Sequence, residues 1–117
     1  MDVQEALAEL LRVSADVTQA AVLDGDGVVV ASTGTAPHAA IASAAENLWQ
    51  MAQRAAGEAG GGILGQLVVE AGQGATFMVV EAGMRIVAIT GRRPASGLVF
   101  FDLRACLRDA FDGEASS

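Results

Sequence analysis

The residue types that carry most enzyme chemistry are sparse in this sequence. It has one histidine, His38, and one cysteine, Cys106, and it has no lysine and no tyrosine. No second histidine, cysteine or carboxylate pair lies at metal-ligand spacing from His38, so we expect a surface residue at the start of a helix. Cys106 lies between Leu103 and Leu107 on an apolar helical face. We therefore expect it to be a small buried side chain and not a nucleophile.

Two short patterns suggest a ligand site but have simpler explanations. Asp24 and Asp26 flank Gly25, a composition typical of a turn, and the further oxygen ligands of a calcium loop are missing. The glycine run 60–62 follows an expected helix, whose C-terminal end repels anions, whereas phosphate loops lead into a helix N-terminus. The absence of lysine excludes a Walker A loop and a Schiff base. We expect no catalytic residue, no metal site and no cofactor, and hence no enzyme.

The charge balance excludes several classes of partner. The chain carries 14 acidic and 7 basic residues, a net charge of −7. A nucleic acid or an anionic membrane surface would require a basic face. The longest uncharged stretch, 27–45, contains Pro37 and His38, so we expect no membrane insertion. The N-terminus has acidic residues where a signal peptide has basic ones, so we expect a cytoplasmic protein.

Hydrophobic periodicity predicts three helices and five strands in an α+β arrangement. Only the long helix is a crossover connection, so the simplest packing is a five-stranded antiparallel sheet with helices on both faces. We expect residues 1–113 to form one domain and residues 114–117 to be a disordered tail. The expected elements, in order, are a helix at 2–13, strands at 17–24 and 28–32, a helix at 37–58, strands at 63–71, 75–82 and 84–90, and a helix at 98–111.

The long helix has more apolar surface than one sheet needs to cover. Its apolar side chains span an arc of roughly 200°, whereas a helix lying on a core needs about 100°. Either weakly apolar alanines pad the arc, or one side of the helix meets the sheet and the other meets a second copy of the chain. Small residues permit close approach, and tryptophan and methionine are enriched in interfaces. The candidate contact residues on this helix are Ala44, Leu48, Trp49, Met51, Ala52 and Ala55.

Several local sequences, taken in order, resemble one family. They are the hairpin 20–28 with the strand 29–32 that follows it, the alanine-rich helix that ends in glycines before the strand 63–70, and the meander from 77–80 to 86–89. Together they resemble the roadblock family, which includes dynein light chains and bacterial regulators of small Ras-like GTPases. The resemblance covers residues 3–111.

The resemblance implies an arrangement and a function. The long helix is expected on one face of the sheet, and the terminal helices on the other. A homodimer is expected through the long helix and the third strand, which adds Ile63, Leu67 and Val69 to the candidate contacts. The expected function is a non-enzymatic homodimeric interaction domain that regulates or scaffolds a small Ras-like GTPase in bacterial signalling. A small-ligand sensory domain and a purely structural scaffold remain as alternatives.

Overall fold

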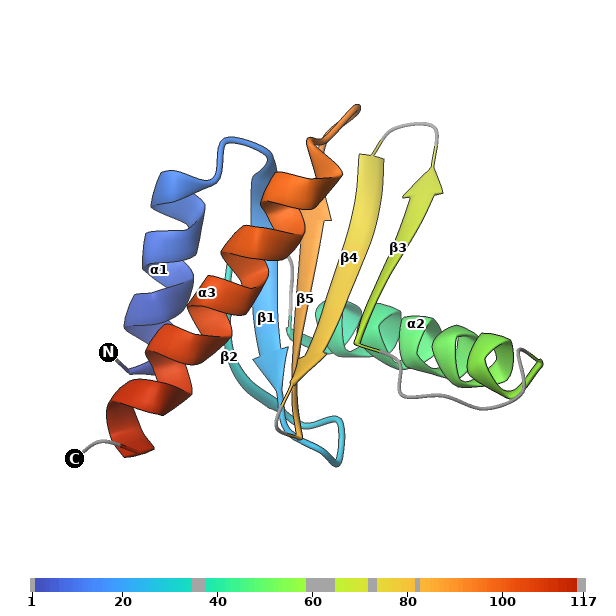
Figure 1. The fold of residues 1–117 in the computed structure, drawn as a ribbon, viewed down its shortest axis with the longest axis horizontal. Coiled ribbons are helices and arrows are strands. Elements are labelled where there is room, and N and C mark those ends of the chain that lie inside the picture. Colours follow the sequence, from blue (N-terminus) through green and yellow to red (C-terminus); the bar gives the residue numbers. More distant parts are fainter. Residues whose placement is uncertain (1, 35–37, 59–64, 72–73, 82, 116–117) are drawn as a thin grey trace.

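The computed structural model describes residues 2–34, 38–58, 65–71, 74–81 and 83–115 (Figure 1). The predicted order of helices and strands is confirmed. The third strand begins at Gln66, and Ile63 lies outside the described residues. The last helix continues to Ala115, beyond residue 113, where we expected the domain to end. The elements are α1 Val3–Val13, β1 Val17–Leu23, β2 Val29–Thr33, α2 His38–Glu58, β3 Gln66–Ala71, β4 Gly74–Glu81, β5 Met84–Thr90 and α3 Ser96–Ala115.

The five strands form one antiparallel sheet in the order β2-β1-β5-β4-β3. Helix α2 packs on one face of this sheet, and α1 and α3 pack on the other, as the resemblance implied (Figure 1). Strands β2 and β3 are the two edges. The last strand of the meander, β5, therefore lies at the centre, between β4, which precedes it in the chain, and β1 from the N-terminal hairpin.

Each face of the sheet has its own apolar core. On the side of α1 and α3, Leu7, Leu103 and Phe77 belong to one buried cluster, and the Phe77 ring meets Phe100 edge-on at 5.0 Å between centroids. On the side of α2, a smaller cluster joins Ile41 and other helix residues to the sheet. Burying one such large side chain contributes about 1.5–3 kcal/mol, so the two-helix face supplies more of the stability.

An irregularity in β1 moves one side chain between these cores. Strict alternation along the strand would place Val17 on the same face as Ala21. The register with β5 shifts between Val17 and Gln19, which is typical of a β-bulge. Val17 consequently lies in the core under α1 and α3, whereas Ala21 lies under α2.

Arg85 joins three elements at the start of β5. Its side chain is buried, its Nη2 donates a hydrogen bond of 2.9 Å to the Gly25 carbonyl, and its guanidinium carbon lies 4.1 Å from the Trp49 ring centroid on α2. Its Nη1 is buried and has no hydrogen-bond partner among the described residues. A single cation thus ties the turn between β1 and β2 and helix α2 to the central strand.

Replacing Arg85 by methionine removes both the hydrogen bond to Gly25 and the cation–π contact with Trp49. We expect the free energy of unfolding to fall by about 2 kcal/mol, measured by urea denaturation at an unchanged m-value. The same replacement at Arg54, which is exposed on α2, is the control and should change it by less than about 0.5 kcal/mol. Equal effects for the two variants would contradict the role given to Arg85.

Cys106 lies in the core between α3 and α1, as predicted. Burial, with a smaller contribution from Asp109, raises the pKa of its thiol to about 12. At pH 8.5 an exposed cysteine is about half ionised, whereas Cys106 in the folded chain stays protonated. We expect iodoacetamide to label the native chain at least roughly a hundredfold more slowly than the urea-unfolded chain, because only the thiolate reacts. Similar rates in the two states would contradict this burial.

Candidate functional site

The residues considered for catalysis or metal binding do not come together. Asp24 Oδ1 accepts hydrogen bonds from the backbone N–H groups of Asp26 and Val28, at 2.9 and 3.0 Å, so its carboxylate holds the turn. His38 begins α2, and Cys106 lies on the opposite side of the sheet. The glycine run 60–62 lies outside the described residues. Within the described part of the chain, no group of three histidine, cysteine or acidic residues could hold a metal ion.

Helix α2 buries only a narrow stripe. Ile41, Ala45, Leu48 and Ala52 follow the spacing of one helical face and are each at most 4% exposed. Of the residues predicted to contact a second copy, Leu48 and Ala52 therefore face the chain's own sheet. The surplus of apolar surface that the sequence indicated lies on the two flanks of this stripe.

The two flanks differ in how they are covered. Trp49 and Met51 are two residues apart, which places them about 200° apart around the helix and so on opposite flanks. Trp49 is half-buried beneath the Arg85 guanidinium. Met51 is 51% exposed, Ala55 is exposed and Ala44 is half-buried. The flank of Ala44, Met51 and Ala55 is therefore the one left open.

This open flank borders a part of the sheet that no described helix covers. Helix α2 crosses the strands near one end, and on its face the other end of the sheet is bare (Figure 1). By strand alternation from Met78 and Val87, the paired residues Thr76 and Ile89 lie on this face of the sheet, and both are half-buried. Neither side chain is charged, and Ile89 continues the apolar character of the helix flank.

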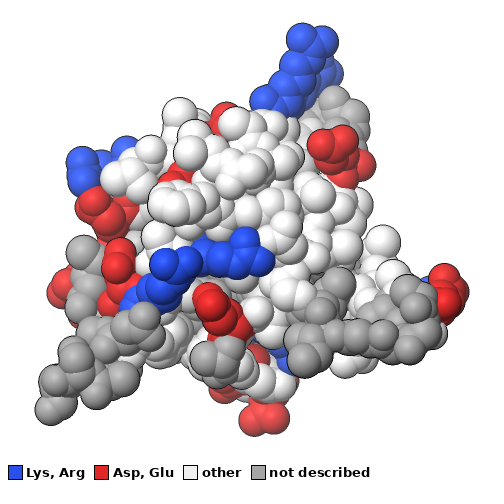
Figure 2. All heavy atoms as spheres, viewed as in Figure 1, with Lys and Arg blue, Asp and Glu red and all other residues white. Residues whose placement is uncertain are grey.

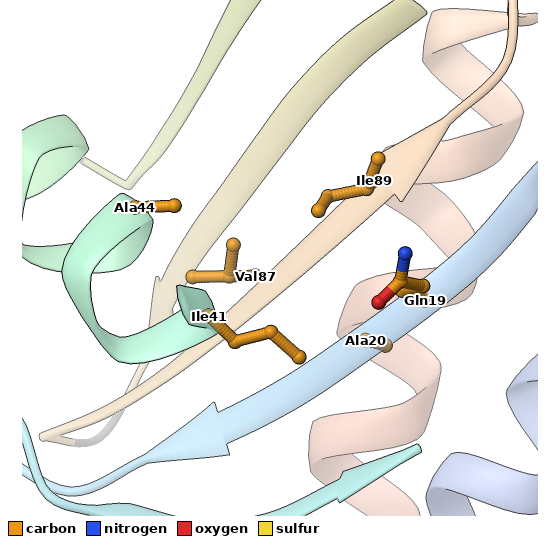
Figure 3. A pocket seen from close by; sticks show the side chains of 6 residues that line it. All are labelled: Gln19, Ala20, Ile41, Ala44, Val87 and Ile89. Atoms are coloured by element: carbon orange, nitrogen blue, oxygen red, sulfur yellow. The ribbon is translucent and has the colours of Figure 1, made fainter. Parts of the chain in front are cut away.

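A small pocket marks the seam between α2 and the sheet (Figure 3). Ile41 and Ala44 approach it from the helix, and Val87 and Ile89 from β5, with Gln19 at its side. The cavity volume of about 10 Å³ corresponds to about one water molecule, whereas small-molecule sites usually enclose about 300–1,000 Å³. The seam is therefore a gap in packing and not a ligand pocket.

Strand β3 extends this surface to the edge of the sheet. Leu67 and Val69 pack partly buried against the core under α2. The Val80 N–H donates a hydrogen bond of 2.9 Å to the Gly65 carbonyl. Because the backbone groups of an antiparallel strand alternate in direction, those of residues 67 and 69 also point toward β4. The backbone groups of residues 66, 68 and 70 point away from β4, toward the open edge of the sheet. We call Ala44, Met51, Ala55, Leu67 and Val69 the α2–β3 surface.

The other edge of the sheet is protected. Helix α1 packs beside β2, and Gln4 Nε2 donates a hydrogen bond of 3.1 Å to the Ser32 carbonyl of that strand. Among the described residues, no side chain occupies the outward backbone groups of β3 in this way. Of the two edges, β3 is the one open to pairing with a further strand.

The fold is shared with several bacterial proteins. A Roadblock/LC7 domain from Streptomyces avermitilis superposes with a TM-score of 0.79 at 23% identity, over 93% of this chain and 94% of its own. Myxococcus xanthus MglB gives 0.79 at 18% identity, over 98% and 96% of the two chains. The gliding protein MglB from Thermus thermophilus gives 0.76 at 16% identity, over 92% and 84%. No curated protein matches the sequence closely enough to count as a relative.

Two further observations concern membrane-spanning helices and the family of the chain. None of the helices in its described segments is both long enough and apolar enough to cross a membrane. The model of the Roadblock/LC7 domain family matches residues 3–89, which is most of the sequence and includes all five strands except the last residue of β5. The resemblance inferred from the hairpin, the long helix and the meander is thereby confirmed, and the chain belongs to the Roadblock/LC7 domain family.

Proposed function

We propose that the chain is a homodimeric interaction domain of the bacterial cytoplasm that regulates or scaffolds a small Ras-like GTPase and has no catalytic activity of its own. The observation that carries this proposal is the α2–β3 surface, where an open apolar helix flank lies beside an open strand edge. The helix flank and the strand edge are next to each other, so one partner can cover both.

A second copy of the chain suits this surface in two ways. A two-fold axis perpendicular to the sheet would place β3 antiparallel to its own copy and join the two sheets. The same axis would bring a second α2 over the bare part of the sheet, with Ala44 and Ala55 allowing close approach of the two helices. The candidate contacts Met51, Leu67 and Val69 would then be buried, whereas Trp49 would stay on the outer flank with Arg85.

The GTPase part of the proposal rests on family membership and on what dimerisation leaves exposed. The polar side of α2, with Glu46, Asn47 and Gln53, points away from the sheet. Two such helices side by side would form one broad polar surface, a suitable platform for a folded partner. With one histidine, one cysteine and no lysine, the chain is expected to have no hydrolytic site of its own, so an effect on hydrolysis would be exerted at the partner's site. A ligand-sensing role has no comparable support, because the seam holds about 10 Å³.

Placing a carboxylate on the open flank should break the dimer. Met51 is already half exposed in the single chain, so we expect Met51→Glu to fold as a monomer. The dissociation constant should rise at least roughly thirtyfold, about 2 kcal/mol, because a charge would be buried without a partner. Sedimentation velocity over a concentration series measures it.

The matched control is Gln53→Glu, which adds the same charge on the exposed polar side of α2 and should leave the dimer intact. Glu70→Pro removes an outward N–H of β3 without removing a hydrogen bond to β4, and should also weaken the dimer. A monomeric wild-type chain, or dimers unaffected by both Met51→Glu and Glu70→Pro, would overturn the homodimer proposal.

The dimer should bind a Ras-like GTPase encoded beside it in the genome. We expect at least roughly tenfold different affinity for its GTP-loaded and GDP-loaded forms, measured by calorimetry, and loss of binding with Met51→Glu. A changed hydrolysis rate identifies a regulator, whereas binding without a change identifies a scaffold. No binding to either form and no change in hydrolysis would reject the GTPase as partner while leaving the dimer untouched.

A further inference from the structure

Helices α1 and α3 lie side by side on the face opposite α2 (Figure 1), and side chains of both helices line a groove between them. Ala6, Leu10 and Val13 line it from α1, and Ala105 and Cys106 line it from α3. The residues from α1 are three or four apart, and on α3 Asp102, Ala105 and Asp109 have the same spacings, so each helix presents one continuous stripe to the groove. The cavity volume is about 50 Å³, which accommodates side chains that project into it and not a metabolite. We call it the α1–α3 groove.

The groove has an apolar floor and an exposed apolar end. Leu10 and Cys106 are buried at its base, whereas Val13, at the end of α1, is 53% exposed. On α3, Leu98 and Phe101 precede groove residues by one helical turn and are 61% and 65% exposed. Exposed apolar side chains that continue a groove of this kind are typical of a protein interaction site.

The rim of the groove is acidic. Asp102 and Asp109 line it from α3, and Glu9 lines it from α1. Glu9 is paired with Arg12, but Asp102 and Asp109 make no ion pair with any described residue. Arg104 and Arg108, the arginines of α3, do not line the groove. Figure 2, which views the molecule from this side, shows several acidic side chains on the left, where α1 lies, with basic side chains at the upper left and across the centre of the same face.

We propose that the α1–α3 groove binds a basic amphipathic helix of a partner protein. The stripe from Ala6 to Val13 is two turns, about 10 Å long, and matches apolar side chains at positions i, i+4 and i+7 of the incoming helix. The small side chains of Ala6 and Ala105 let the helix approach closely. Its lysines and arginines then reach the unpaired carboxylates of Asp102 and Asp109, and the net charge of −7 accelerates its association.

The acidic rim disfavours other candidate ligands of the α1–α3 groove. A second copy would bring the same acidic rim against Asp102 and Asp109. An anionic membrane or a nucleic acid would be repelled by this rim and by the net charge of −7. The groove lies across the sheet from the α2–β3 surface, so it stays open whether or not the chain dimerises.

The test uses a fluorescein-labelled synthetic peptide of about 18 residues, five helical turns, with leucine along one helical face and lysine or arginine elsewhere, in fluorescence anisotropy titrations. We expect saturable one-to-one binding by the full chain. Asp102→Asn with Asp109→Asn should weaken it about tenfold, because two charge contacts are lost. Ala105→Met, which fills the groove, should weaken it by more than that. Met51→Glu should bind as the wild type does.

The matched control for the charge loss is Glu70→Gln with Glu81→Gln, two exposed carboxylates on β3 and β4. A peptide of the same composition with its apolar face scrambled is the control for the helix. The proposal is overturned if the wild-type chain does not bind the amphipathic peptide. It is also overturned if the control variant weakens binding as much as the Asp102 and Asp109 pair, or if the scrambled peptide binds equally well.

Discussion

One helix cannot cover one face of a five-stranded sheet, and the rest of the structure follows from this mismatch. A strand of seven residues is about 23 Å long, whereas a helix with its side chains is about 10 Å across. On one face the chain provides two helices, α1 and α3, and buries the larger core. On the other face it provides only α2, which crosses the strands near one end (Figure 1). The bare part of the sheet and the open helix flank beside it are both consequences of that single helix.

The position of α2 matters as much as the fact that it is alone on its face. Arg85 stacks on Trp49 from the central strand and also binds the Gly25 carbonyl, so the outer flank of the helix is fixed against the hairpin turn. A guanidinium buried in this way costs desolvation, and its unpaired Nη1 adds to that cost. This cost offsets part of the stability that the hydrogen bond and the Trp49 contact contribute, and the same contacts also fix the orientation of the helix. They hold one flank of α2 so that the opposite flank, with Met51, faces the bare sheet.

Local patterns in the sequence were sufficient to predict the helices and strands, but not to predict how these elements pack against one another. Glycine-containing turns and strand periodicity predicted β5 to the residue, and the aspartate–glycine turn predicted the hairpin. The helical arc correctly indicated surplus apolar surface, but it assigned Leu48 to a partner when the chain's own sheet covers it. The residues next to Arg85 and Trp49 in the sequence do not indicate that these two side chains stack, because one lies on a strand and the other on a helix, far apart along the chain. The α1–α3 groove likewise depends on packing between the two ends of the chain.

The hydrogen bond from Gln4 to Ser32 has a consequence for how large an assembly can become. A sheet with two open edges can add neighbours at both and polymerise into a fibre, as in cross-β aggregates. A sheet with one occupied edge can pair with only one further sheet. Two such sheets satisfy each other across a two-fold axis, and growth ends there. A glutamine on the first helix thus limits, from the opposite side of the molecule, what β3 can build.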